Sequence, residues 1–225
     1  MDIKILLSNI AETTEAFDVS GLSLNTKTLT KGDLFIALQG EKSHGAEYID
    51  SAIENGCIAV LIEGRDVDCG VPTIRIDNLK PHLSGLAQNF YTKAKDVDLI
   101  AVTGTNGKTS VSHYISQLLD FLEVNNGVIG TLGISKVEKK SINTTPDIFS
   151  IYSSLEEYSS QGIKLAIIEA SSHALMQDRL EGLSFVQGIF TNLTQDHLDY
   201  HQTMGNYKEA KGKLFTNGFS KKAII

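Results

Sequence analysis

The sequence predicts an α/β protein: a small N-terminal α/β domain, followed by a domain in which a parallel sheet carries a phosphate-binding loop. Three observations lead to this fold class. Short apolar runs alternate with helix-length amphipathic segments in both parts, a glycine-rich loop follows one apolar run, and a polar stretch at 92–98 separates the two patterns. We therefore expect domains at 1–95 and 96–225.

The first domain is expected to combine short strands with two helices. Apolar runs bounded by turn residues predict strands at 34–38, 58–62 and 73–76, and a helix is expected at 46–55. A second helix is expected at 80–91, because apolar side chains recur there at helical spacing, at Leu83, Leu86, Ala87 and Phe90.

The second domain alternates strands and helices in the way that parallel sheets require. Strands are expected at 99–102, 127–130, 165–169 and 188–191, and helices at 110–122, 148–161 and 204–215. Residues 222–225 begin one more apolar strand, and a central strand is an unusual place for a domain to end. We therefore expect this domain to be truncated and the chain to be a fragment.

Composition excludes several kinds of partner. The net charge of −7 argues against a surface that binds nucleic acid. Cys57 and Cys69 lack metal-ligand spacing, and two cysteines without a secretion signal fit reduced thiols in a cytoplasm. No apolar stretch approaches a membrane span. We expect a soluble, cytoplasmic monomer that does not insert into membranes.

The stretch 98–109 joins a buried strand to a loop that suits phosphate. Two glycines allow a sharp turn that points backbone N–H groups at an anion, and the following Lys-Thr pair supplies a cation and a hydroxyl for magnesium. The strict Walker pattern has glycine where this chain has Val102, so a purely structural glycine turn is the alternative. The residues expected to bind the phosphates of a nucleotide are Gly104, Thr105, Asn106, Gly107, Lys108, Thr109 and Ser110.

A carboxylate ends the apolar run 165–169. Glu169 would lie at the carboxyl end of a strand, where ligands bind in such sheets, and beside a phosphate loop it suits magnesium. The alternative is structural, because Ser and Glu after a strand often only begin a helix.

Titratable groups are dense in the segment 196–201, which reads Asp-His-Leu-Asp-Tyr-His directly after a strand. Such density is unusual unless something binds these groups, although a solvated loop before the next helix is the alternative. That helix carries Lys208, Lys211 and Lys213, and the composition alone assigns none of them a role.

Four motifs occur in a fixed order: Thr103-Gly-Thr-Asn-Gly-Lys-Thr109, Asn143-Thr-Thr-Pro146, Glu169-Ala-Ser-Ser-His-Ala-Leu175 and Asp196-His-Leu-Asp-Tyr-His201. As an ordered set they resemble the Mur ligases of bacterial peptidoglycan synthesis, in particular the branch that adds the third amino acid of the stem peptide. The segments 24–27, 31–37 and 44–49 are similar to that family's N-terminal domain, which holds a uridine nucleotide. The resemblance covers nearly the whole chain.

The resemblance implies an ATP-dependent amide ligase whose partners are a UDP-N-acetylmuramoyl dipeptide and a free amino acid. Such enzymes phosphorylate the substrate carboxylate with ATP, and the amine then attacks the acyl phosphate. ATP and Mg²⁺ are the implied cofactors. By matching position, Lys108 would stabilise the transferring phosphoryl group and Thr109 would ligate the first magnesium. Glu169 and His197 would also hold metal.

The resemblance also singles out one lysine. Lys211 occupies the place of the family lysine that reacts with carbon dioxide to form a carbamate, which ligates magnesium; with Lys108 and His197 it completes the implied catalytic set. Positions that match contacts to the muramoyl dipeptide are Asn143, Thr144, Thr145, Ser171, Gln177 and Arg179. Positions that match the uridine diphosphate site are Leu24, Thr26, Glu41, Lys42 and Ser43.

The sequence departs from the family pattern in places. The uridine-site motif Asp-Ser-Arg is replaced by residues 25–27, Asn-Thr-Lys, so a hydroxyl survives but the guanidinium is lost. The family's Asp-Gly pair is His44-Gly45 here. We find no C-terminal ligase domain in these 225 residues, so we expect this polypeptide alone not to complete the reaction.

Three other functions remain open at this point. Folylpolyglutamate synthase shares the phosphate loop and a carbamylated lysine, but lacks a uridine-type N-terminal domain. A simple phosphate-loop kinase or ATPase would need no second nucleotide domain, and residues 20–77 argue against it. A non-catalytic module that binds a UDP-sugar is the third.

Overall fold

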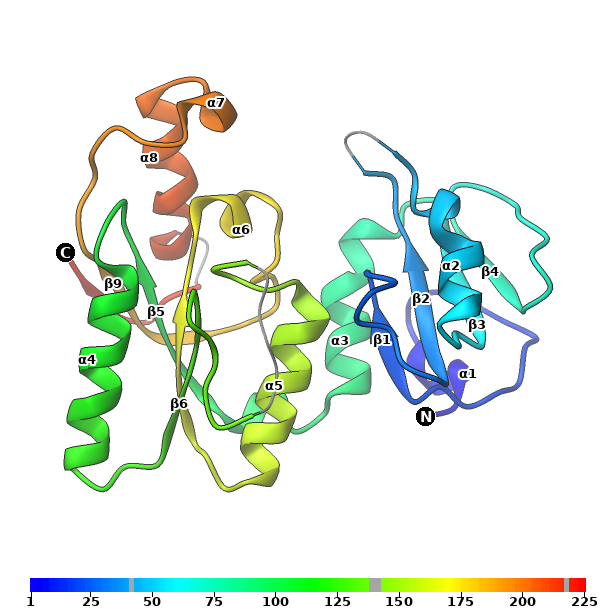
Figure 1. The fold of residues 1–225 in the computed structure, drawn as a ribbon, viewed down its shortest axis with the longest axis horizontal. Coiled ribbons are helices and arrows are strands. Elements are labelled where there is room, and N and C mark those ends of the chain that lie inside the picture. Colours follow the sequence, from blue (N-terminus) through cyan, green and yellow to red (C-terminus); the bar gives the residue numbers. More distant parts are fainter. Residues whose placement is uncertain (41–42, 138–142, 217–218) are drawn as a thin grey trace. The chain divides into compact units, whose positions relative to one another are not determined.

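The computed structural model describes residues 1–40, 43–137, 143–216 and 219–225 (Figure 1). The chain forms two compact units, Met1–Tyr91 and Thr92–Ile225. Unit 2 begins at Thr92 because the short 3-10 turn Ala94–Asp96 packs against the helix Ile148–Ser160 of that unit. The Lys93 N–H also donates a hydrogen bond to the side chain of Glu156 in that helix (2.6 Å).

Unit 1 is a four-stranded parallel sheet with strands in sequence order: β1 (Gly21–Ser23), β2 (Asp33–Ala37), β3 (Ala59–Glu63) and β4 (Thr73–Ile76). Its helices are α1 (Ile3–Leu6), α2 (Ile49–Glu54) and α3 (Leu83–Phe90), with 3-10 turns at Gly45–Tyr48 and Lys80–His82. The three predicted strands and both predicted helices are confirmed. Helix α1 and strand β1 were not predicted, because they are too short to show a period.

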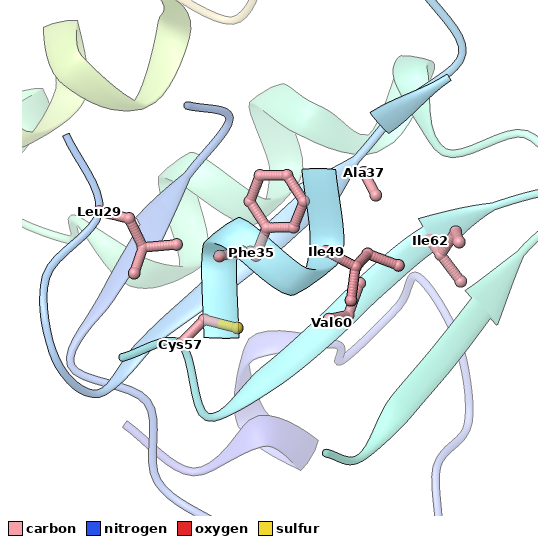
Figure 2. Close-up of a cluster of buried hydrophobic side chains, with 8 residues drawn as sticks. Leu29, Phe35, Ala37, Ile49, Cys57, Val60 and Ile62 are labelled. Atoms are coloured by element: carbon pink, nitrogen blue, oxygen red, sulfur yellow. The ribbon is translucent and has the colours of Figure 1, made fainter. Parts of the chain in front are cut away.

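One face of this sheet is covered by α2. Every residue of β2 is buried, as expected of a central parallel strand with both faces covered. Figure 2 shows Phe35 of β2, Val60 of β3 and Ile49 of α2 in the same core. The full buried cluster is Leu29, Phe35, Ala37, Ile49, Ala52, Cys57, Val60 and Ile62.

Unit 2 is a six-stranded sheet in the order β10-β9-β5-β8-β6-β7. All strands are parallel except β7, which pairs antiparallel with β6, so the parallel sheet is confirmed for the strands that the sequence predicts. The strands are β5 (Asp98–Thr103), β6 (Asn126–Gly130), β7 (Gly133–Ile134), β8 (Leu165–Glu169), β9 (Phe185–Phe190) and β10 (Ala223–Ile224).

The helices of unit 2 are α4 (Lys108–Phe121), α5 (Ile148–Ser160), α6 (Ser172–Met176), α7 (Leu198–His201) and α8 (Met204–Gly212), which continues as the 3-10 turn Lys213–Phe215. The three predicted helices are confirmed. Helix α6 is the one that the structural alternative for Glu169 offered, and α7 was not predicted. Helices α6, α7 and α8 gather at the carboxyl end of the sheet (Figure 1). Within the described ranges, no helix is long and apolar enough to cross a bilayer.

Each unit is expected to fold without the other, because each has its own sheet and its own buried cluster. Chains 1–91 and 92–225, produced separately, should each give a cooperative unfolding transition by circular dichroism. Limited proteolysis of the whole chain should cut near the junction at residues 91–92 and leave two resistant pieces. The prediction would be contradicted if the whole chain unfolded in one transition and neither separate piece showed any cooperative unfolding.

Candidate functional site

The phosphate loop leaves β5 and enters α4 through two glycines with positive φ. Gly104 has φ 143° and Gly107 has φ 86°, and Gly107 is the N-cap of α4. The N–H groups in the first turn of α4 have no partner inside the helix, and the helix dipole makes this end positive. The loop therefore has the geometry of an anion-binding site.

Two lysines converge on one carbonyl oxygen of this loop. The Lys108 Nζ donates to Gly104 O (2.9 Å) and to Thr105 O (3.0 Å), and the Lys211 Nζ on α8 donates to the same Gly104 O (2.7 Å). Lys211 is only 1% exposed. Burial, and secondly the charge of Lys108, lower the pKa of Lys211 to about 7, while Asp196 acts in the opposite direction. Burial also lowers the pKa of Lys108, against the effect of Glu169 and Asp196.

Glu169, the last residue of β8, is fully buried (0% exposed) beside the loop. Its Oε2 accepts hydrogen bonds from the hydroxyls of Thr109 (2.9 Å) and Thr131 (3.0 Å), and its Oε1 accepts one from the Thr131 N–H (3.1 Å). Strand β8 lies between β5 and β6, so the carboxylate reaches the end of the loop from the neighbouring strand. The segment also begins a helix, because the Ser171 hydroxyl caps α6 by accepting from the Ala174 N–H.

Gly130 makes room for this carboxylate, because a Cβ at that position would overlap the Glu169 side chain. Gly130→Ala is expected to destabilise the protein by about 1–3 kcal/mol and to weaken nucleotide binding, since Glu169 must move. The matched control is Gly212→Ala on α8, where a Cβ meets nothing within 4 Å and which should be neutral or slightly stabilising. Urea titration of both variants tests this, and equal stabilities would contradict it.

The residues present fit a magnesium ion that also binds phosphates. A buried carboxylate with two hydroxyls is an all-oxygen donor set, and magnesium is usually held by one or two carboxylates together with phosphate oxygens. A hydrogen bond joins Thr109 to Glu169, whereas His197 lies among the rings of His173 and Tyr207. Among the described residues, no group of three His, Cys, Asp or Glu side chains is arranged to hold a metal by itself.

His197 lies in a cluster of rings on and around α7 and α8. Its ring centroid is 4.9 Å from that of His173 and 6.2 Å from that of Tyr207. The Lys211 Nζ lies 4.6 Å from the centre of the same Tyr207 ring. Tyr207 therefore lies against both His197 and Lys211. Burial is the main cause that lowers the pKa of His173 and of His201.

The positions matched to the muramoyl dipeptide form a hydrogen-bonded group at the start of α5 and α6. Buried Thr145 donates to Glu169 O (2.6 Å) and its hydroxyl accepts from the Ser171 N–H (3.0 Å). Arg179 donates through Nη1 to Thr145 O (2.7 Å) and through Nε to Gln177 Oε1 (3.0 Å). Burial lowers the pKa of Arg179, against the effect of Asp147.

The remaining two matched positions differ in exposure. The Thr144 hydroxyl lies 3.1 Å from the Thr131 hydroxyl, which donates its own proton to Glu169, and this contact ties Thr144 to the Glu169 group. Asn143 is exposed.

In unit 1 the positions matched to uridine diphosphate follow adjacent strands. Leu24 and Thr26 come after β1 and Ser43 after β2, so all three lie toward the carboxyl edge of the same parallel pair. The loop after β1 is held by Asn25, whose carbonyl accepts from the Ser23 hydroxyl (2.9 Å). Glu41 and Lys42 lie outside the described residues.

Three residues that the structure places in this site were not predicted: Thr131, Asn192 and Tyr207. Thr131 gives two hydrogen bonds to Glu169, Asn192 pairs with the phosphate loop, and the fully buried Tyr207 hydroxyl contacts Thr105 Oγ1 (3.2 Å). The Tyr207–Lys211 spacing of four residues places both on one helix face and was a usable signal. The sequence held no comparable signal for Thr131, because that residue lies in a turn.

Fold and site together define a two-unit α/β protein whose second unit carries a phosphate-binding loop. Residues 102–225 match the Mur ligase middle domain, and residues 18–91 match the catalytic domain of the Mur ligase family. The chain belongs to the Mur ligase family.

Curated relatives of this chain bear the name UDP-N-acetylmuramoyl-L-alanyl-D-glutamate–2,6-diaminopimelate ligase. The protein of Haemophilus influenzae (strain PittGG) is 39% identical over 221 residues, which is 93% of this chain and 45% of the relative. That of Aquifex aeolicus is 41% identical over 210 residues, which is 92% of this chain and 43% of the relative. The chain thus spans less than half the length of these relatives.

Solved structures show the same fold. A structure of a ligase with that name superposes with a TM-score of 0.79 at 29% identity, covering 99% of this chain and 46% of that one. A MurF ligase from Thermotoga maritima, in complex with ADP, superposes with a TM-score of 0.59 at 21% identity, covering 90% of this chain and 44% of that one. The second likeness concerns the fold alone.

Proposed function

We propose that this chain carries the uridine-nucleotide and ATP-binding parts of an ATP-dependent amide ligase that extends the peptide of a UDP-N-acetylmuramoyl dipeptide in the cytoplasm. One observation carries the proposal. The phosphate loop after β5 lies beside the buried carboxylate of Glu169, and the Nζ atoms of Lys108 and Lys211 both donate to the Gly104 carbonyl oxygen of that loop. The names of the curated relatives support the substrate class.

The proposed reaction begins with attack of the substrate carboxylate on the γ-phosphorus of ATP, which gives an acyl phosphate and ADP. The amine of a free amino acid then adds to the acyl carbon, and phosphate leaves from the tetrahedral intermediate. Both reactants of the first step are anions, so nearby cations must offset their repulsion. The position of Lys108 at the start of α4, where its Nζ lies against the loop, supports this role.

Magnesium, when bound, would neutralise phosphate charge in this site, with Thr109 and Glu169 as the protein groups nearest the loop. Glu169 is suited to this role because its three hydrogen bonds fix the carboxylate in place. Arg179 would orient the carboxylate end of the substrate, and Gln177 and the Thr145 carbonyl oxygen hold its guanidinium in place.

We further propose that Lys211 is carbamylated. The neutral amine attacks the carbon of CO₂, a C–N bond forms, and the Nζ proton passes to solvent, which leaves an anionic group with two oxygens. The reaction requires an uncharged amine, and burial together with Lys108 lowers the pKa of Lys211 to about 7. Lys208 on the same helix is exposed and is not expected to react.

Binding measurements test the proposed function. Unit 1 should bind UDP-N-acetylmuramoyl-L-alanyl-D-glutamate in calorimetry and should not bind folate, whereas folate binding alone would favour a folylpolyglutamate synthase. The whole chain should also bind ATP with Mg²⁺. Binding of the UDP-sugar without any ATP binding would leave only a non-catalytic UDP-sugar module, and binding of neither would overturn the proposal.

A further inference from the structure

Asn192, two residues after β9, pairs with the phosphate loop through both ends of its side-chain amide. Its Oδ1 accepts a hydrogen bond from the Asn106 N–H (3.0 Å), and its Nδ2 donates to the Asn106 carbonyl oxygen (3.0 Å). Its backbone carbonyl also accepts from the Thr105 N–H (2.9 Å). One residue therefore makes three hydrogen bonds to two consecutive residues of the loop.

Thr191 reinforces this pairing from the preceding position. Its hydroxyl donates to the Asn106 carbonyl oxygen (2.6 Å), and its N–H donates to Thr103 O (2.9 Å). A Cβ at Gly104 would overlap the Thr191 side chain, so only glycine allows the two segments to lie this close. The chain after β9 therefore stays hydrogen-bonded to the chain after β5, so that residues 191–192 run alongside the phosphate loop beyond the end of the sheet.

The pairing decides which N–H groups of the loop face a ligand. Asn106 is exposed and lies outside regular secondary structure, so burial does not fix its conformation. With the Thr105 and Asn106 N–H groups both donating to Asn192, the N–H groups of the first turn of α4, which begins at Lys108, remain available to meet an anion.

We infer that Asn192 is a positioning residue that holds the phosphate loop in its anion-binding shape before a ligand arrives. The inference rests on the proposed function in one respect, that the anion is the phosphate chain of a nucleotide. A loop held in its bound conformation loses less conformational freedom on binding, and this raises affinity without any contact between Asn192 and the ligand.

Two substitutions separate this role from simple stabilisation. Asn192→Ala removes both side-chain hydrogen bonds. Asn192→Asp keeps an acceptor for the Asn106 N–H, but loses the donor and adds a negative charge near the loop. Asn89→Ala is the matched control, because Asn89 donates to Leu6 O (2.9 Å) in unit 1, away from the loop in sequence and sheet.

The experiment measures, for each variant of the whole chain, the water-exchange rate of the Asn106 amide by NMR, the Kd for ATP with Mg²⁺, and the urea midpoint. Asn192→Ala should exchange faster, bind ATP about two- to tenfold more weakly and lower the urea midpoint slightly. The expected loss is smaller than the full value of two hydrogen bonds, because the freed Asn106 groups are exposed to water. Asn192→Asp should keep the slow exchange and still bind ATP more weakly. Asn89→Ala should change neither the exchange nor the Kd.

Unchanged exchange of Asn106 in Asn192→Ala would overturn the inference, as would faster exchange with unchanged ATP affinity. If the wild-type chain binds no ATP at all, the proposed function fails at its nucleotide site. The exchange rates of the unliganded chain then decide the inference alone: faster exchange in Asn192→Ala supports it, and equal exchange overturns it.

Discussion

Lys108→Ala is expected to lower ATP turnover by about 10²–10³-fold in any longer form of this protein that carries ligase activity. The lysine acts on charge that develops as the phosphoryl group moves, and such groups act mainly on the rate. In the 225-residue chain the same change should weaken binding of ATP with Mg²⁺ and leave binding of the UDP-sugar to unit 1 unaffected.

The control for this change is Lys208→Ala, which removes an exposed lysine from α8 with the same change of net charge. Calorimetry with ATP should give wild-type affinity for this control. Near-normal ATP binding and turnover in Lys108→Ala would show that the stretch 104–109 is only a structural turn.

Lys211→Met is expected to stabilise the fold while abolishing function. Lys211 is 1% exposed, and the structure records no carboxylate in hydrogen-bond contact with its Nζ among the described residues. Replacing a buried charge by an apolar side chain of similar length is often stabilising. In CO₂-free buffer near pH 6.5, the variant should raise the thermal midpoint by about 3 °C or more. The lost hydrogen bond to Gly104 O reduces this gain.

The pH dependence of that gain follows from the pKa of Lys211. Folding lowers this pKa from 10.5 to about 7, so between these values the unfolded chain binds more protons and stability rises with pH. At or below pH 7 the folded protein must bury the full charge. The advantage of Lys211→Met should therefore be largest there and shrink as the pH approaches 10.5. A gain that is equal at about pH 6.5 and about pH 10 would contradict charge burial as its cause, and Lys208→Met should give no gain.

Much of the fold was predictable because its strands are short, apolar and separated by clear turns. The run 99–102 and the helix from 110 onward needed only hydrophobic patterning, and the structure places them in β5 and α4. The antiparallel β7 and the helices α6 and α7 were not predictable in this way. They are two to five residues long, and their conformation is set by tertiary contacts such as that of buried His201 with the Ser172 hydroxyl (2.9 Å).

Part of the candidate site was predictable, because a carboxylate that directly follows an apolar strand, such as Glu169, can be placed at the carboxyl edge of the sheet from sequence alone. Pattern alone did not choose among Lys208, Lys211 and Lys213, because α8 has a weak apolar face; the family resemblance made that choice. The structure then showed that only Lys211 of the three is buried. Partners contributed by distant segments, such as Asn192 to the loop, depend on the sheet order and could not be read from spacing.

The central claim is that the loop at the end of β5 binds the phosphates of ATP. An NMR titration of the ¹⁵N-labelled chain with ATP and Mg²⁺ tests it most directly. We predict saturable shifts of the amides from Gly104 to Ser110, with smaller shifts at Glu169 and Asn192, and none along β1 to β4 of unit 1. Shifts confined to unit 1, or an unchanged loop at millimolar ATP, would contradict this claim.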